Sequence, residues 1–126
     1  MIALDASALL AFLFRETGHE QVSALLATAC LSTVNLAEVM GRFVRDGHDA
    51  RPIPRLLSNS GLEIVPFTAT DASLAASLLP VTRPLGLSLG DRACLALALS
   101  RGIAALTADR VWADLDIGVT IHLIRS

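Results

Sequence analysis

Short apolar runs alternate with helical patterns along this chain, and polar residues mark the places where one gives way to the other. An apolar stretch over residues 1–4 ends at Asp5, and residues 6–14 follow with the alanines and leucines that favour a helix. The pattern predicts a short strand with Asp5 at its carboxyl end and a helix directly after it.

Residues 87–101, LSLGDRACLALALSR, have a different pattern, because residues 93–99 are apolar on nearly every side of a helix. A helix that is apolar all round belongs inside a domain. Ser88 can cap this helix, and Asp91 falls in its first turn. We therefore expect a central buried helix that holds a carboxylate at its amino-terminal end.

The rest of the chain continues the alternation. We expect further helices at 19–27, 33–45, 52–59 and 69–79, a loop over 80–86, and a turn or short helix over 110–114. Further strands are expected near Leu31 and at 62–65, 103–106 and 119–124. Strands separated by helices pair in parallel, so the prediction is an α/β fold: one domain over residues 1–126, built as a three-layer α/β/α sandwich with a central, mostly parallel sheet.

The helix expected over 33–45 has an apolar and a polar face. The apolar face, which we expect to be buried, carries Leu36, Met40, Phe43 and Val44. The polar face carries Asn35, Glu38, Arg42 and Arg45.

Composition narrows the possible functions. Of the 126 residues, 53% are hydrophobic and 17% charged, as in a compact domain with a large core. All ten basic residues are arginine, which excludes any chemistry that needs a lysine.

The two cysteines are expected to be buried free thiols, and the three histidines share no metal-ligand spacing. The apolar run over 2–14 is too short to cross a bilayer, so we expect a soluble, cytoplasmic protein.

Four carboxylates are placed where the predicted elements meet. Asp5 and Asp109 follow strands, and Glu38 and Asp91 are expected in the first turns of helices. Ligands of open parallel sheets bind at the carboxyl ends of the strands, so the four can converge. Converging carboxylates need a cation, and Mg²⁺ or Mn²⁺ is the ion that oxygen ligands suit.

Such a site would suit phosphodiester hydrolysis, in which a metal ion activates water and stabilises charge on the phosphate. Candidates for holding the phosphate backbone of a nucleic acid are Arg42, Arg45, Arg92 and Arg110.

Each acid also has a simpler interpretation, and spacing alone leaves both open. Asp5 can cap a helix, and Asp91 can complete a capping box begun by Ser88. Glu38 can pair with Arg42 four residues later, and Asp109 can belong to an ordinary turn.

Four segments, taken together and in order, resemble the PIN-domain ribonucleases of the VapC toxin type over essentially the whole chain. They are LDASALLAFLFRE with Asp5, STVNLAEV with Glu38, LSLGDRACLALA with Asp91, and TADRVW with Thr107, Asp109 and Trp112.

The resemblance implies that Asp5, Glu38, Asp91 and Asp109 are catalytic and bind Mg²⁺ or Mn²⁺. It implies that Ser7, Asn35 and Thr107 orient the ligands or water. It further implies an endoribonuclease that acts as the toxin of a type II toxin–antitoxin pair, has a cognate antitoxin protein as partner and forms a homodimer.

The carboxylates are also compatible with two other kinds of function. One is a catalytically silent PIN-like module that binds RNA or protein. The other is a receiver-type phosphoacceptor, which needs a lysine that this chain lacks.

Overall fold

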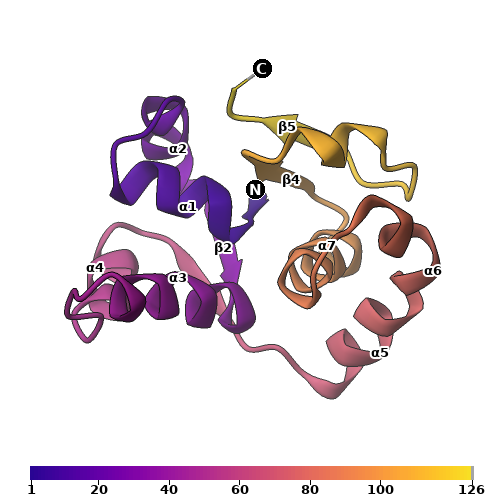
Figure 1. The fold of residues 1–126 in the computed structure, drawn as a ribbon, viewed down its shortest axis with the longest axis horizontal. Coiled ribbons are helices and arrows are strands. Elements are labelled where there is room, and N and C mark those ends of the chain that lie inside the picture. The colour runs from indigo at the N-terminus through magenta and orange to yellow at the C-terminus, as the bar shows by residue number, and fades with distance from the viewer. Residues whose placement is uncertain (126) are drawn as a thin grey trace.

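A five-stranded sheet forms the centre of the molecule in the computed structural model, which describes residues 1–125. Its strands are β1 (Ile2–Leu4), β2 (Ala29–Ser32), β3 (Glu63–Val65), β4 (Ala104–Thr107) and β5 (Ile121–Leu123). They lie in the order β3-β2-β1-β4-β5, and every neighbouring pair is parallel (Figure 1). The predicted parallel sheet is confirmed, with β1 in the middle.

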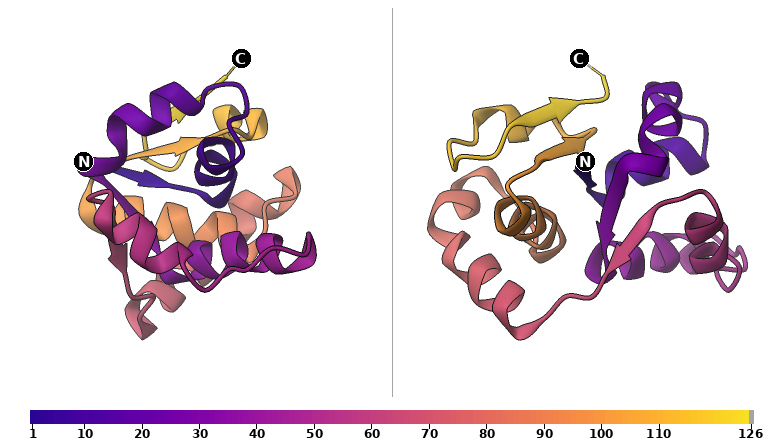
Figure 2. Two further views of the ribbon diagram at one scale, coloured as in Figure 1. Left: turned by 90° about the vertical axis from the view of Figure 1, so that its left-hand side faces the viewer. Right: turned by 180° about the vertical axis from the view of Figure 1, so that it is seen from behind.

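Helices cover both faces of this sheet (Figures 1 and 2). The α-helices are α1 (Ala6–Leu13), α2 (His19–Leu25), α3 (Thr33–Arg45), α4 (Ile53–Asn59), α5 (Ala69–Ser77), α6 (Leu79–Thr82) and α7 (Leu89–Arg101). The 3₁₀ helices are η1 (Leu26–Thr28), η2 (Arg83–Leu85) and η3 (Arg110–Asp114). The predicted three-layer arrangement is therefore present.

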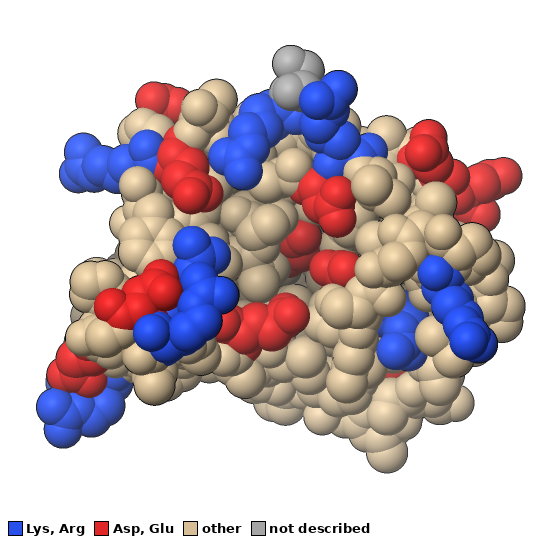
Figure 3. All heavy atoms as spheres, in the orientation of Figure 1, with Lys and Arg blue, Asp and Glu red and all other residues tan. Residues whose placement is uncertain are grey.

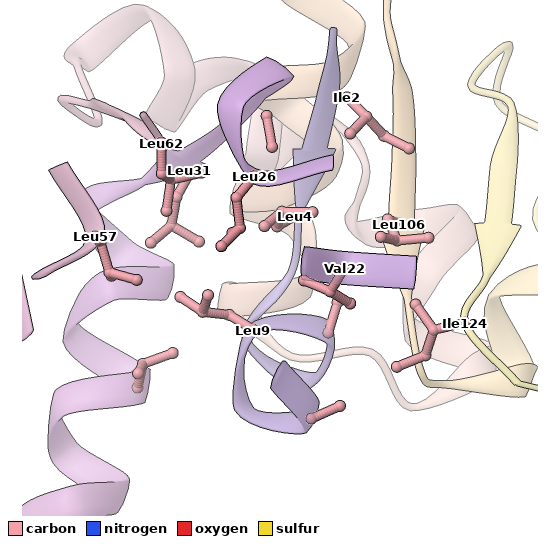
Figure 4. Close-up of a cluster of buried hydrophobic side chains, with 14 of the residues drawn as sticks. Ile2, Leu4, Leu9, Val22, Leu26, Leu31, Leu57, Leu62, Leu106 and Ile124 are labelled. Carbon is pink, nitrogen blue, oxygen red and sulfur yellow. The ribbon is translucent and has the colours of Figure 1, made fainter. Parts of the chain in front are cut away.

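Alternate residues of the strands point into two separate cores. Leu4, Leu31 and Leu106 pack on one face with residues of α1, α2 and α4 (Figure 4). Ala3, Cys30 and Ala105 pack on the other face against α7, together with Trp112 of η3. Small residues from the strands on this second face let α7 lie close to the sheet, and Ala93 to Leu97 of α7 are all buried.

Three sequence-based expectations are wrong in the helices. Val44 is 65% exposed and not part of a buried stripe, whereas Asn35, expected on the polar face, is fully buried. The predicted loop over 80–86 forms α6 and η2, because Pro80 and Pro84 lie in first turns, where a missing N–H removes no helical hydrogen bond.

Cys30 and Cys94 are buried free thiols, as predicted. Within residues 1–125 no helix has the length and apolar character needed to span a bilayer.

Candidate active site

The order of the strands reverses at β1, since β2 and β3 lie on one side of it and β4 and β5 on the other. In open α/β sheets such a switch point, at the carboxyl ends of the strands, is where ligands bind. Asp5 follows β1, and Thr107 ends β4 beside it. The candidate site is at this edge of the sheet.

Asp5 is 2% exposed and is held by three hydrogen bonds. Its Oδ1 accepts from the Ser7 hydroxyl at 2.7 Å and from the Ala8 N–H at 2.9 Å, so it caps α1 as the simpler interpretation predicts. Its Oδ2 accepts from the Thr107 hydroxyl at 2.7 Å. Burial raises the pKa of Asp5 from 3.8 to about 6, against the opposing effect of these hydrogen bonds, and the charge of Asp91 adds to the rise.

Glu38 lies in the second turn of α3. The expectation from the sequence, which places it in the first turn of a helix, is wrong. Its Oε1 accepts a hydrogen bond of 2.9 Å from Asn35 Nδ2, and the same nitrogen donates to the Gly90 carbonyl of α7, also at 2.9 Å. Burial raises the pKa of Glu38, and the negative charge of Asp91 raises it further. Asn35 therefore joins Glu38 to the first turn of α7.

Asp91 completes a capping box at the start of α7. Its Oδ2 accepts from the Ser88 N–H at 2.8 Å, and its own N–H donates to Ser88 Oγ at 3.2 Å. The capping role proposed from the sequence is confirmed. The cap also holds the carboxylate where its charge acts on Asp5 and Glu38.

Asp109 lies just beyond β4 and caps η3, where its Oδ1 accepts from the Val111 N–H at 3.1 Å. Its own N–H donates to Thr107 Oγ1 at 3.0 Å. Because the Thr107 hydroxyl also donates to Asp5, one side chain connects the two aspartates. Ser7 adds a second link, since its Oγ accepts from the Ala108 N–H at 3.0 Å.

Three of the four acids have the donor chemistry that suits a hard divalent cation, whereas both carboxylate oxygens of Asp5 already accept hydrogen bonds. Glu38, Asp91 and Asp109 each have one carboxylate oxygen that accepts a hydrogen bond and one that accepts none from residues 1–125. Over the same range none of the four acids pairs with an arginine. Unpaired carboxylate oxygens are the ligands that Mg²⁺ and Mn²⁺ take.

The side chains nevertheless do not converge on one point. In the described part of the chain no three His, Cys, Asp or Glu side chains are close enough to hold a metal ion together. The Asn35 amide connects Glu38 to the first turn of α7, in which Asp91 lies, and Thr107 connects Asp109 to Asp5. A four-acid ligand set stays a prediction.

Acidic side chains gather around a hollow in the middle of the face shown in Figure 3, and arginine side chains lie around its margin. Arg42 and Arg45 both pair with Asp46, at 3.0 and 3.1 Å, and Arg42 also stacks 5.5 Å from the Phe14 ring centroid. The alternative pairing of Glu38 with Arg42 is not formed.

The other two candidate arginines differ in their surroundings. Arg92 points toward α5, where its Nη1 donates to the Ala75 carbonyl at 3.1 Å, and its Nε is buried without a partner in the described chain. Arg110 is exposed and directly follows Asp109. Of the pair, Arg110 is the one whose guanidinium makes no hydrogen bond within residues 1–125.

Gly90 is a residue of this site that the sequence pattern did not predict. It is buried in the first turn of α7, and a Cβ there would collide with the carboxyl group of Glu38. The available signal was the glycine itself, since glycine is unfavourable within a helix and often marks a close approach.

The PIN domain family model matches residues 2–118 of the chain. No curated protein matches it. Solved structures with a similar fold include a toxin-antitoxin complex from Klebsiella pneumoniae, at 20% identity and a TM-score of 0.71, with 95% of this chain and 96% of that chain covered.

Two further structures are similar. One is DNA-bound VapBC from Salmonella typhimurium, at 17% identity and a TM-score of 0.73, with 98% of this chain and 99% of the other covered. The other is VapBC2 from Rickettsia felis bound to a DNA fragment from its promoter, at 18% identity and a TM-score of 0.72, with 98% of each chain covered. At these identities the likeness establishes the fold.

Proposed function

The chain belongs to the PIN domain family, and from this premise we propose that it is a metal-dependent endoribonuclease that hydrolyses RNA phosphodiester bonds. The observation that carries the proposal is the position of three carboxylates from three elements, Asp5, Glu38 and Asp91. The charge of Asp91 raises the pKa of the other two, and none of the three has an arginine partner within residues 1–125. Such a group of acids is stabilised by a cation.

In this proposal Asp5, Glu38, Asp91 and Asp109 hold Mg²⁺ or Mn²⁺. When bound, the ion supplies activation of a water molecule and stabilisation of the negative charge that develops on the phosphate. Thr107 and Ser7 hold Asp5 in place, and Asn35 holds Glu38. Their contacts explain how the acids keep their directions at the end of the sheet.

The RNA backbone is proposed to contact the four candidate arginines, Arg42, Arg45, Arg92 and Arg110. Arg110 is the best placed, because it is exposed and adjacent to Asp109. Arg42 and Arg45 would share their charge between Asp46 and phosphate, and Arg92 would first have to give up its contact with α5.

We propose further that the protein is the toxin of a toxin–antitoxin pair, with a cognate antitoxin as partner and a homodimer as its assembly. The support for the antitoxin is that a solved structure with this fold is a toxin-antitoxin complex.

The experiment is cleavage of total cellular RNA by the purified chain, with Mg²⁺ or Mn²⁺ and with EDTA. We expect cleavage that EDTA abolishes and that Asp91→Asn lowers at least about 100-fold, as loss of a charge-stabilising group does. The matched control is Asp71→Asn, because Asp71 completes the same kind of capping box on α5, and its hydrogen bonds are with Thr68. Unchanged cleavage by Asp91→Asn would refute the proposed mechanism.

A second candidate function is a silent PIN-like module that binds RNA or protein. It is favoured by one observation, that no three acids in residues 1–125 stand close enough to hold a metal ion as they are placed. The same experiment separates the two functions, since a silent module would bind RNA and show no turnover with either ion.

A further inference from the structure

We infer that Gly90 is a positioning residue, whose missing side chain leaves the space in which the Glu38 carboxyl group lies against the first turn of α7, next to Asp91. The inference rests on the proposed function, because its consequence is measured as metal binding. It concerns the distance between two proposed ligands that come from different helices.

The space at Gly90 is already filled by Glu38. A Cβ built at this position would meet Oε1, Oε2 and Cδ of Glu38, all nearer than real Cβ contacts come. No other residue is among the three nearest groups. Any side chain at position 90 would therefore displace the carboxyl group of Glu38.

Backbone conformation does not explain this glycine. Six glycines of the described chain have positive φ, and Gly90 is not among them. It lies in a helix, where alanine is more favourable than glycine. Gly41 in α3 is also helical, yet a Cβ there would meet nothing within 4 Å. The contact with Glu38 therefore distinguishes Gly90 from an ordinary helical glycine.

Asn35 holds both sides of this contact. Its fully buried amide nitrogen donates one hydrogen bond to Glu38 Oε1 and one to the Gly90 carbonyl, each 2.9 Å long. Its Oδ1 is buried without a partner among the described residues, which is unfavourable for a polar atom. The hydrogen-bonding capacity of Asn35 is thus only partly used, and its contribution to the site comes from the two hydrogen bonds that its NH₂ group donates.

Together, Asn35 and Gly90 fix where Glu38 lies relative to Asp91. Asn35 occupies one carboxylate oxygen of Glu38 and leaves Oε2 without a donor from residues 1–125. Gly90 directly precedes Asp91, so the Glu38 carboxyl group lies against the same first turn of α7 that holds Asp91. An added methyl group at position 90 would push the Glu38 carboxyl group away from the first turn of α7, in which Asp91 lies.

The test is Gly90→Ala, with Gly41→Ala as the matched control. Three properties are measured on the full chain: thermal unfolding in EDTA, Mn²⁺ affinity by titration calorimetry, and the ¹H–¹⁵N signals of the Asn35 side-chain amide in EDTA. We expect Gly90→Ala to unfold at or above the wild-type temperature, because the colliding atoms belong to a flexible side chain and alanine favours the helix. Its Mn²⁺ affinity should fall at least about tenfold, and the Asn35 signals should move. Gly41→Ala should change neither the affinity nor the signals.

A second substitution distinguishes displacement of Glu38 from general damage. Glu38→Asp is one methylene shorter, so alone it should weaken Mn²⁺ binding by withdrawing the carboxylate from the ion. In the Gly90→Ala background the shorter side chain fits beside the new methyl group, and the combined loss should be smaller than the product of the two single losses.

The inference is overturned if Gly90→Ala leaves Mn²⁺ affinity and the Asn35 signals unchanged, or if the two losses simply multiply. If the wild-type chain binds no Mn²⁺ and cuts no RNA, the proposed function fails on its own. In that event the Asn35 signals of Gly90→Ala in EDTA decide whether residue 90 positions Glu38.

Discussion

Asp5 combines nearly complete burial with a carboxyl group whose charge the proposed function requires. Its pKa of about 6 in the folded protein lies above the ordinary value of 3.8, so the folded state holds the proton over a pH range in which the unfolded chain has lost it. Stability therefore falls as the pH rises through this range, and the full cost, on the order of 3 kcal/mol, is present above about pH 6.

Asp5→Asn should remove this cost in protein that is kept free of metal by EDTA. The advantage of the variant over the wild type in free energy of unfolding should grow by about 2 kcal/mol from pH 4 to pH 7, because residue 5 of the variant carries no charge to bury. Urea unfolding of both proteins across this range measures the difference. Parallel pH profiles for the two proteins would mean that ionising Asp5 does not lower the stability of the folded protein.

The residue types of the site could be predicted from the sequence, and their contacts could not. The ends of predicted elements marked Asp5, Asp91 and Asp109. The sequence pattern predicts Asn35 on a polar face, because its partner, the Gly90 carbonyl, is 55 residues away and no helical period indicates that contact. Long-range hydrogen bonds of this kind decide whether a polar residue is buried.

At the scale of elements, α7 was predictable because local signals agreed. Its apolar composition, the Ser88 cap and Gly102 after its last residue all indicate the helix that the structure contains. The helices α6 and η2 could not be predicted, because proline is common both in loops and in the first turn of a helix. Only tertiary packing decides between the two. Thr82 of α6 is fully buried, which shows that packing.

The two capping boxes of the chain allow the structural and functional roles of a cap to be separated. Ser88→Ala and Thr68→Ala each remove the hydroxyl that caps a helix, α7 and α5 respectively, and each should cost about 1 kcal/mol of stability. Only Ser88→Ala should also weaken Mn²⁺ binding, because the Ser88 cap fixes the direction of Asp91.

Chemical denaturation and Mn²⁺ titration of the two capping variants provide the comparison. Equal effects of both substitutions on metal affinity would show that Asp91 does not depend on its cap for its direction.

At the scale of the whole molecule, the sequence indicated parallel strands and left their order open. Alternation of strands and helices predicts parallel pairing, but the jump from β3 across the sheet to β4 follows from packing on both faces. That jump pairs Leu4 with Leu106, which places Asp5 beside Thr107 although 102 residues separate them. The site at the switch point is therefore a property of the topology.

Because the proposed ligands come from α3, from α7 and from the residues just after β1 and β4, binding of one ion should stabilise the entire fold. At a free Mn²⁺ concentration of about 100 times the dissociation constant, the free energy of unfolding should rise by about 2.7 kcal/mol. At one fixed free Mn²⁺ concentration the rise should be larger at pH 8 than at pH 5, since at the lower pH a proton on Asp5, whose pKa is about 6, competes with the ion and raises the dissociation constant.

Thermal unfolding of the wild type, Asp91→Asn and Asp71→Asn, each with Mn²⁺ and with EDTA, tests this coupling. Asp71→Asn should retain the full stabilisation by Mn²⁺, because its capping box is on α5 and its partner is Thr68, while Asp91→Asn should lose most of it. If Mn²⁺ stabilises the two variants equally, the ion binds elsewhere, and the acids at the switch point are held together by the fold alone.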